Sequence, residues 1–283
     1  MGWLFEPGLF SSGPVHTAAL IGAIVAVVSA GVGVFTVLRG QSFAGHSLAD
    51  VATSGGSGAL LLGLSPLTGF LGGGVIGALA MDLIGVQRVR DRDLATGIVL
   101  GVATGLSALF LYLAATSKEI NGATQQILFG SIFTLQSSTI PLVVVFGSLT
   151  LLALGCIARP LLLCSVSPEA AAARGIPVRL IGSVFIVALA VAVGLSALAI
   201  GAVLSTALLI GPAASALRLT SRLWTAAITA AVLGVATTWV GIALAYDSYY
   251  WASSHPDIPV SFWIVALIVA VYLVSSLVAW VRR

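Results

Sequence analysis

Charged side chains are scarce in this sequence, since aspartate, glutamate, lysine and arginine make up only 7% of its 283 residues. Soluble domains carry about a quarter of their residues as charged side chains, so this composition excludes a soluble protein. Hydrophobic residues make up 59% of the chain, and the mean hydropathy is +1.15. The stretches between apolar runs reach only about 20 residues, too short for a separate folded domain. We therefore expect one polytopic membrane domain over residues 1–283.

Sequence motifs that mark nucleotide-binding and metal-dependent enzymes are also missing. The chain contains neither a Gly-x4-Gly-Lys-Ser/Thr phosphate loop nor a His-Glu-x2-His metal motif, and we expect it to be no enzyme. Its two cysteines, Cys156 and Cys164, are too few for a zinc site, and we expect free thiols at the start of a basic loop. The first residues, MGWLFEPGLF, contain no basic region, so we expect no cleavable signal peptide.

Nine apolar windows are long enough to cross a bilayer as helices. The expected fold class is therefore an all-α membrane protein with about nine transmembrane helices, or eight if one short segment is re-entrant. The second and seventh windows are short and rich in small residues, which favours positions inside the bundle. The windows lie at 15–38, 44–63, 67–86, 94–116, 139–158, 180–199, 201–217, 223–246 and 260–281.

Basic residues recur after every second window. Because short loops rich in lysine and arginine stay in the cytoplasm, this spacing predicts an outside N-terminus and a cytoplasmic C-terminus. His16 and His255 then lie at the outer face, where a metal role for either stays open. Eleven of the twelve cations follow the pattern and only Lys118 departs from it; the eleven are Arg39, Arg88, Arg90, Arg92, Arg159, Arg174, Arg179, Arg218, Arg222, Arg282 and Arg283.

Two ionisable residues fall inside the second window. His46 and Asp50 are four residues apart, so they project from one face of a helix. Asp50 lies about 15 Å beyond Arg39 along the helix, near the middle of a ~30 Å hydrocarbon core. A charged group at that depth costs at least ~2.5 kcal/mol and normally faces a polar path or a partner. Imidazole and carboxylate both bind divalent transition metals, so the pair is a candidate half-site; the alternative is that neighbours satisfy both groups.

Glycine repeats occur in the third and fourth windows. Gly69, Gly73 and Gly77 share one helix face, and so do the fourth-window glycines Gly97, Gly101 and Gly105. Such spacing lets helix backbones approach closely, so we expect tight helix crossings at both repeats.

The loop from Ser165 to Leu180 has clear helix signals. Ser167 can cap a short helix, Pro168 suits its first position, and Glu169 favours its positive end. Gly175 stops the helix. We therefore expect a cytoplasmic helix at about residues 167–176, with a small-residue surface at Ala172 that could insert into another protein; the alternative is an ordinary turn.

Several motifs together resemble the permease subunit of bacterial ABC importers for zinc, manganese and iron. The loop segment ends in Gly175 and Ile176, and a Leu-Leu-Ile-x-Pro-Ala-Ala-x-Ala pattern surrounds Pro212. The resemblance covers about residues 15–281. Earlier in the chain it includes Arg39, Ser42, His46, Asp50, Gly55 and the Gly-Leu-Ser-Pro segment ending at Pro66, and then Asp93 with the Ala-Thr-Gly-Ile segment near it.

The resemblance implies a homodimer in a bacterial plasma membrane. It further implies two cytoplasmic ATPase subunits docked at residues 167–176, and an extracytoplasmic metal-binding protein. His46 and Asp50 then form a transient metal path, with Gly55, Pro66 and Pro212 in pathway or packing roles. Many relatives carry aspartate first and histidine second, whereas this chain reverses the order.

The resulting hypothesis is a transport subunit without a tightly bound cofactor, passing Zn²⁺ or Mn²⁺ into the cytoplasm, with Fe²⁺ as a further candidate. The alternative is a stand-alone secondary transporter that couples a cation to a proton gradient through Asp50. Such transporters usually contain paired broken helices in two halves, a symmetry that this sequence does not show.

Overall fold

The computed structural model describes residues 12–84, 92–117, 123–130, 132–251 and 258–282. Over these ranges every regular element is a helix, and two of them are short 3-10 turns, η1 and η2. The elements are α1 Gly13–Leu38, α2 Ser42–Leu61, α3 Pro66–Ile84, α4 Arg92–Ser117, α5 Ala123–Phe129, η1 Ile132–Thr134, η2 Ser137–Thr139, α6 Ile140–Val166, α7 Pro168–Ala173, α8 Val178–Ile200, α9 Ala202–Leu219, α10 Leu223–Trp251 and α11 Val260–Val281.

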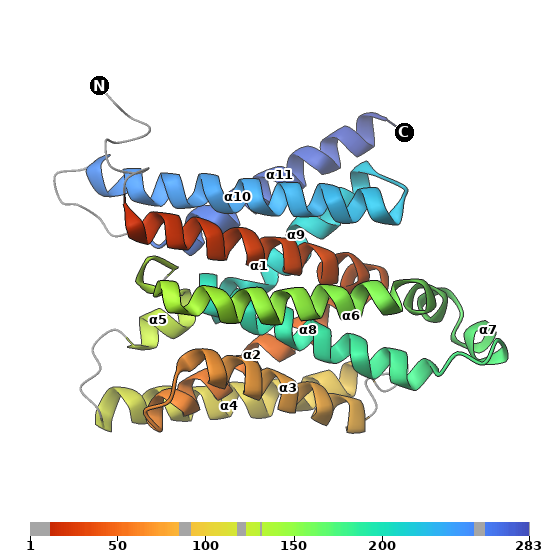
Figure 1. The fold of residues 1–283 in the computed structure, drawn as a ribbon, viewed down its shortest axis with the longest axis horizontal. Helices are drawn as coiled ribbons and strands as arrows, with labels where there is room; N and C mark the ends of the chain where they lie inside the picture. The colour runs from red at the N-terminus through yellow and green to blue at the C-terminus, as the bar shows by residue number, and fades with distance from the viewer. Residues whose placement is uncertain (1–11, 85–91, 118–122, 131, 252–257, 283) are drawn as a thin grey trace.

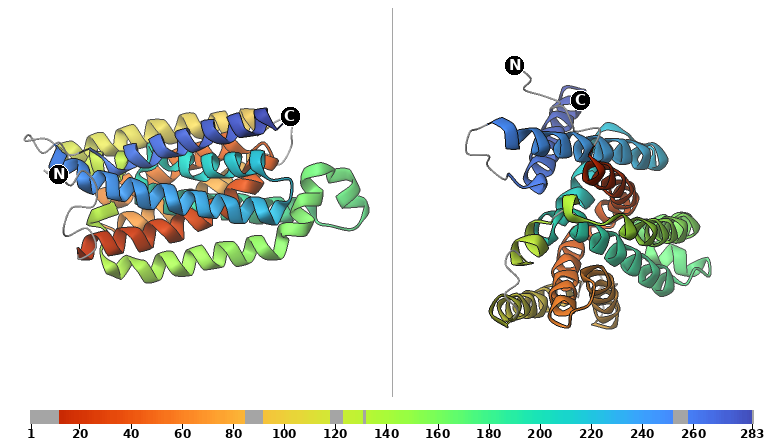
Figure 2. Two further views of the ribbon diagram at one scale, coloured as in Figure 1. Left: turned by 90° about the horizontal axis from the view of Figure 1, so that it is seen from above. Right: turned by 60° about the vertical axis from the view of Figure 1, so that its left-hand side comes forward.

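The long helices lie side by side in a bundle, with the start of α1 and the end of α11 at opposite ends (Figure 1; Figure 2). Helices α1 and α8 form its centre: α1 packs against α6, α8, α9 and α10, and α8 also packs against α2 and α3. In the α8 span 78% of residues are buried, against 17% in the α11 span. An apolar helix with so little burial faces lipid, so α11 lies at the periphery.

The predicted all-α membrane fold is confirmed. Among the described residues, eight helices are long and apolar enough to cross a membrane. Helix α2 has 20 residues, enough for a span by length, but it is not among these eight because His46, Asp50 and several small polar residues lower its hydropathy. It packs instead between α3, α4, α8 and α9. The prediction that the second window lies inside the bundle was correct.

A close crossing joins α2 to α3. A methyl group added at Gly55 would collide with the backbone oxygen of Gly69 and lie 2.7 Å from the Cα of Gly73. Only glycine permits this approach. The α3 repeat therefore makes the predicted tight crossing. The α4 repeat does not, because a Cβ at Gly97 or Gly101 would meet nothing within 4 Å.

The cysteines are both free thiols, as predicted, but they do not lie in a loop. Helix α6 continues about two turns beyond its predicted end and includes both Cys156 and Cys164. The helix also contains Pro160, which removes one backbone donor without ending it. Leu161 and Cys164 are buried and Ser165 is bonded to Arg39, so packing holds this part of α6 in place.

The described arginines lie at one end of the bundle. Arg39 and Arg282 cap the C-terminal ends of α1 and α11, and Arg218 lies in the last turn of α9. Helix α7 projects from the same end, beyond the ends of α6 and α8 (Figure 1). Arg88, Arg90, Lys118 and Arg283 lie outside the described residues.

Candidate functional site

Helix α2 places His46 and Asp50 on one face, in its second and third turns. His46 is exposed and Asp50 is half-buried, although the helix around them is largely buried. Small residues such as Gly45 and Ala49 allow α8 and α9 to cover the opposite side of the helix. The two potential metal ligands are therefore left on the uncovered side of an otherwise enclosed helix.

Asp50 is held by a residue that the sequence analysis did not identify. Thr104 Oγ1 on α4 donates a hydrogen bond of 2.8 Å to Asp50 Oδ2. The same hydroxyl lies 2.9 Å from the Leu100 carbonyl oxygen. Thr104 is the polar residue between Gly101 and Gly105. Its hydroxyl among small residues is the one feature of the sequence that indicates a polar contact here. Its contact orients the carboxylate and leaves Oδ1 without a partner among the described residues.

Hydroxyl groups also hold α2 against α4. Ser54 Oγ donates to the Ala103 carbonyl at 2.7 Å and contacts Ser107 Oγ at 2.8 Å. Ser47 Oγ donates to the Thr96 carbonyl at 3.2 Å. Interhelical hydrogen bonds of this kind take the place of the hydrophobic effect inside a membrane. They fix the position of α2, and with it the positions of His46 and Asp50.

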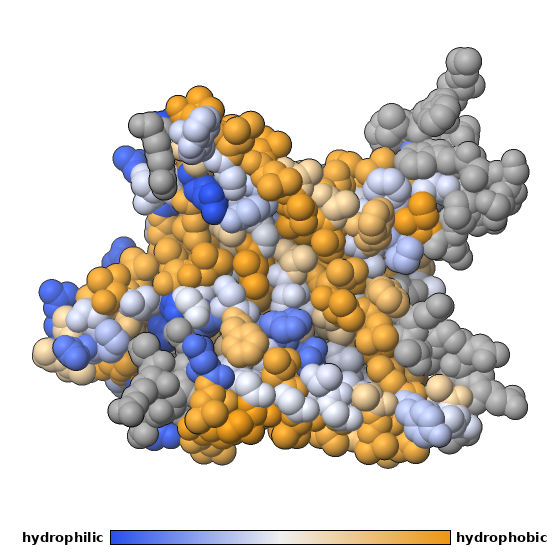
Figure 3. Space-filling view, turned by 180° about the vertical axis from the view of Figure 1, so that it is seen from behind, coloured by the Kyte–Doolittle hydropathy of each residue, from blue (hydrophilic) through white to orange (hydrophobic). Residues whose placement is uncertain are grey.

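The face of the molecule opposite to that of Figure 1 is hollowed along its middle. Pale and blue hydrophilic side chains lie in the hollow between orange hydrophobic ridges (Figure 3). Within the described ranges, no group of three or more His, Cys, Asp or Glu side chains is placed to hold a metal ion. The described part of one copy therefore offers two such side chains at this site, fewer than the four to six ligands that transition metals usually take.

The remaining predicted site residues do not share the helix face of His46 and Asp50. His16 is exposed in the first turn of α1, about 35 Å along that helix from the α1–α2 turn. His255 lies outside the described residues. Pro66 begins α3, and Pro212 is buried inside α9 near Gly234 of α10. Gly55 has the packing contact with α3 described above.

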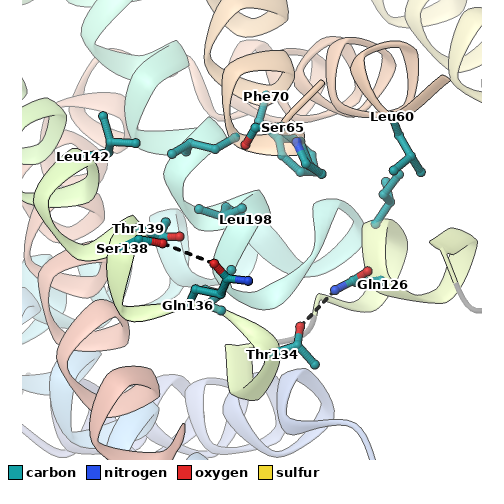
Figure 4. A pocket seen from close by; sticks show the side chains of 14 residues that line it. Leu60, Ser65, Phe70, Gln126, Thr134, Gln136, Ser138, Thr139, Leu142 and Leu198 are labelled. Carbon is teal, nitrogen blue, oxygen red and sulfur yellow. Dashed lines mark hydrogen bonds between the residues drawn. The ribbon is translucent and has the colours of Figure 1, made fainter. Parts of the chain in front are cut away.

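A cavity of about 390 Å³ lies at the end of the bundle opposite to α7, between α2, α3, α5, α6 and α8 (Figure 4). Gln126 donates to Thr134 Oγ1 at 2.9 Å, and Ser138 Oγ donates to Gln136 Oε1 at 3.3 Å. All of its lining residues are uncharged. The cavity therefore contains no carboxylate, imidazole or thiolate, and its lining includes neither His46 nor Asp50.

Helix α7 has the end signals that the sequence predicts. Ser167 caps it, with the Ala170 N–H donating to Ser167 Oγ at 3.2 Å, and Pro168 is its first residue. At the other end Gly175 has φ +75°, and the Ile176 N–H donates to the Ala171 carbonyl at 3.1 Å. This pattern is a Schellman motif, which ends a helix sharply. The helix has six residues, fewer than predicted.

One side of helix α7 is buried and the other is exposed. Ala171 is fully buried against the rest of the chain, whereas Ala172 and Glu169 are exposed. The helix thus presents small side chains outward on a rigid, capped turn.

Comparison with known proteins identifies the family. The model of the ABC 3 transport family matches residues 14–279. The chain belongs to this family. It is a permease, the membrane-embedded component of an ABC transporter complex, and it is not the ATPase. This family assignment excludes the alternative hypothesis of a stand-alone secondary transporter.

Individual relatives are named for metal transport. The manganese import system permease protein ScaB of Streptococcus parasanguinis is 27% identical over 230 residues, covering 81% of each chain. The chelated iron transport system membrane protein YfeC of Yersinia pestis is 30% identical over 119 residues, covering 42% of this chain and 37% of YfeC.

Two solved structures have the same fold. PsaBC from Streptococcus pneumoniae in complex with Fab superposes with a TM-score of 0.76 at 23% identity, covering 95% of this chain and 92% of that one. An inward-facing putative metal-chelate type ABC transporter superposes with a TM-score of 0.74 at 16% identity, covering 95% and 87%.

Proposed function

We propose that this permease carries a divalent transition metal across the membrane along the open face of α2. The observation that carries the proposal is the exposed His46 beside the half-buried Asp50, on a helix otherwise enclosed by four others. The carboxylate offsets part of the charge of a partly dehydrated cation, and the imidazole supplies a second ligand. A pair of ligands binds weakly, and conduction requires a cargo that can leave again.

A second copy of the chain completes the site. Two ligands from each copy make four, which reaches the four to six that transition metals usually take. Exposed apolar residues on α2 and α4, such as Phe43 and Val102, give the second copy a surface to cover. The functional unit that we propose is therefore a homodimer with the metal path between its two copies.

Helix α7 docks a cytoplasmic ATPase. Its docking residues are Ser167, Pro168 and Glu169 at the start, Ala172 on the outer surface, and Gly175 and Ile176 at the end. Arginines gather at this end of the bundle, which supports a cytoplasmic location by the positive-inside rule. The opposite end then faces outward from the bacterial plasma membrane, where an extracytoplasmic metal-binding protein delivers the cargo.

The candidate cargoes are Mn²⁺, Fe²⁺ and Zn²⁺. Manganese and chelated iron appear in the names of ScaB and YfeC, which favours Mn²⁺ or Fe²⁺. One carboxylate and one imidazole suit Mn²⁺, Fe²⁺ and Zn²⁺ alike. Metal selection therefore depends on the geometry of the assembled pair of copies.

The test is uptake by the reconstituted permease and its ATPase in vesicles, with radiolabelled Mn²⁺, Fe²⁺ and Zn²⁺ supplied separately. We expect ATP-dependent accumulation of at least one metal. Accumulation without ATP, or none of the three metals with an active ATPase, would contradict the proposal.

A further inference from the structure

The side chain of Arg39 joins three helices at the end of the bundle from which α7 projects. Arg39 caps the C-terminal end of α1. Its Nη1 donates to Ser165 Oγ in the last turn of α6 at 3.2 Å, and its Nε donates to Gln41 Oε1 at 3.2 Å. Its guanidinium carbon lies 5.3 Å from the centroid of the Phe185 ring of α8. One cation therefore contacts α6, α8 and the turn before α2.

Two of these contacts lie on the helices that α7 connects. Ser165 is three residues before Pro168, and its hydroxyl also donates to the Leu161 carbonyl at 2.6 Å. Phe185 is fully buried, so its ring has little freedom to move. A displacement of α7 must move the end of α6 or the start of α8, because α7 is joined to both by only a few residues. Either movement therefore displaces a helix that Arg39 contacts.

The third contact leads to the candidate metal ligands. Gln41 is the N-cap residue of α2 and is only 3% exposed. Its N–H donates to the Thr36 carbonyl at 2.9 Å, and its carbonyl accepts from the Gly45 N–H at 3.0 Å. His46 and Asp50 follow about 8 and 14 Å further along the same helix. A shift of Gln41 is therefore a shift of the whole first half of α2.

We propose that Arg39 is a positioning residue that transmits movement of α7 to α2. The inference rests on the proposed function, in which α7 receives the ATPase and α2 carries the metal. Arginine suits the task because its planar guanidinium holds several donors in fixed directions while one face lies on an aromatic ring. Lysine keeps the charge but has one flexible ammonium group, so it cannot hold both hydrogen bonds and the ring contact in the same geometry.

A purely structural anchor would make the same contacts but would not link hydrolysis to transport. The experiment therefore measures metal uptake and ATP hydrolysis together, in vesicles containing the complete complex. The variants are Arg39→Lys and Ser165→Ala. The matched control is Ser148→Ala, which removes an exposed hydroxyl of the same helix α6 that bonds only within its own turn. Ser165→Ala removes one oxygen atom, so it tests the link even where an Arg39 variant folds poorly.

We expect both test variants to hydrolyse ATP at close to the wild-type rate and to transport about fivefold less metal per ATP, the lower end of typical coupling between sites. Ser148→Ala should keep the wild-type ratio. If the wild-type complex takes up metal and both Ser165→Ala and Arg39→Lys keep its ratio of metal transported per ATP, the role of Arg39 is overturned and the proposed function is not. A parallel fall of both rates with a lower melting temperature also overturns it, because that is the behaviour of an anchor. Absence of metal uptake by the wild-type complex overturns the proposed function and this inference together.

Discussion

Thr104 Oγ1 lies 2.8 Å from Asp50 Oδ2 and donates a hydrogen bond to it, linking α4 to the candidate metal helix α2. The hydroxyl occupies one carboxylate oxygen and thereby orients the other. Partners of this kind hold metal-binding carboxylates in a fixed direction and tune their affinity. Because Thr104 is exposed on the open side of α4, the bond forms beside the proposed path and not within the packed core.

Replacing Thr104 by valine should weaken metal binding. Valine keeps the branched shape of threonine but removes the donor, and loss of such a partner typically costs about 10-fold or more in metal affinity. Thr104→Ser keeps the hydroxyl and serves as the control. The measurement is the metal concentration at half-maximal uptake, which should rise for Thr104→Val only. Equal values for the two variants would remove Thr104 from the metal path.

Neutralising Asp50 should reduce uptake sharply. Asp50→Asn keeps the size of the side chain but removes the charge that offsets cation desolvation, and His46→Ala removes the second ligand. We expect each variant to insert and fold while uptake of radiolabelled metal falls about 10-fold or more. A neutral amide would be tolerated if Asp50 were only a packed structural group. Uptake at the wild-type rate in vesicles with equal amounts of folded Asp50→Asn complex would exclude this path.

The helical fold and the His46 and Asp50 pair could be predicted from the sequence because both depend on local signals. An apolar run of about 20 residues matches the bilayer thickness, and a spacing of four residues defines a helix face. Asp50 and Thr104 are 54 residues apart, and their contact depends on how α4 packs on α2, which no local pattern specifies.

The two glycine repeats illustrate the same limit. They are alike in sequence, yet only the α3 repeat meets another backbone, that of Gly55 and its neighbours on α2. Spacing indicates that a face permits close approach, but the neighbour is chosen by the packing of the whole bundle. The contacts of Arg39 with Ser165 and Phe185 likewise depend on the packing of α6 and α8, which are distant from it in sequence.

Gly55→Ala should destabilise the permease. The added methyl group would collide with the backbone of α3, which cannot rotate away as a side chain can, so the helices must separate. Overpacking of this kind costs about 1–3 kcal/mol. The control is Gly72→Ala on α3, where a Cβ meets nothing within 4 Å. Melting temperatures in detergent should fall for Gly55→Ala only, and a similar melting temperature for both variants would show that the crossing tolerates expansion.

Single cysteines should report the orientation of the bundle. Gln126 is exposed on α5 at one end, and Arg174 is exposed after α7 at the other. In a background with Cys156 and Cys164 replaced by serine, a membrane-impermeant maleimide added outside cells should label Gln126→Cys and not Arg174→Cys. The positive-inside distribution is the physical reason for this expectation. Both positions should react after permeabilisation, and outside labelling at position 174 would reverse the proposed topology.

Ala172→Arg should separate assembly of the permease from its use of ATP. Ala172 is exposed on α7, and the helix is held at both ends by the Ser167 cap and the Gly175 turn, so the permease itself has room for a larger side chain. A docked ATPase would meet a bulky charge where a methyl group had been, and a charge buried without a partner is strongly destabilising. The variant should therefore insert normally, bind the ATPase at least about 10-fold more weakly than wild type, and lose uptake.

Ala172→Ser, which changes the volume little, should retain both ATPase binding and uptake. The measurement pairs co-purification of the ATPase with metal uptake in the same preparation. If Ala172→Arg retained ATPase binding and uptake, α7 would be an ordinary connection between α6 and α8.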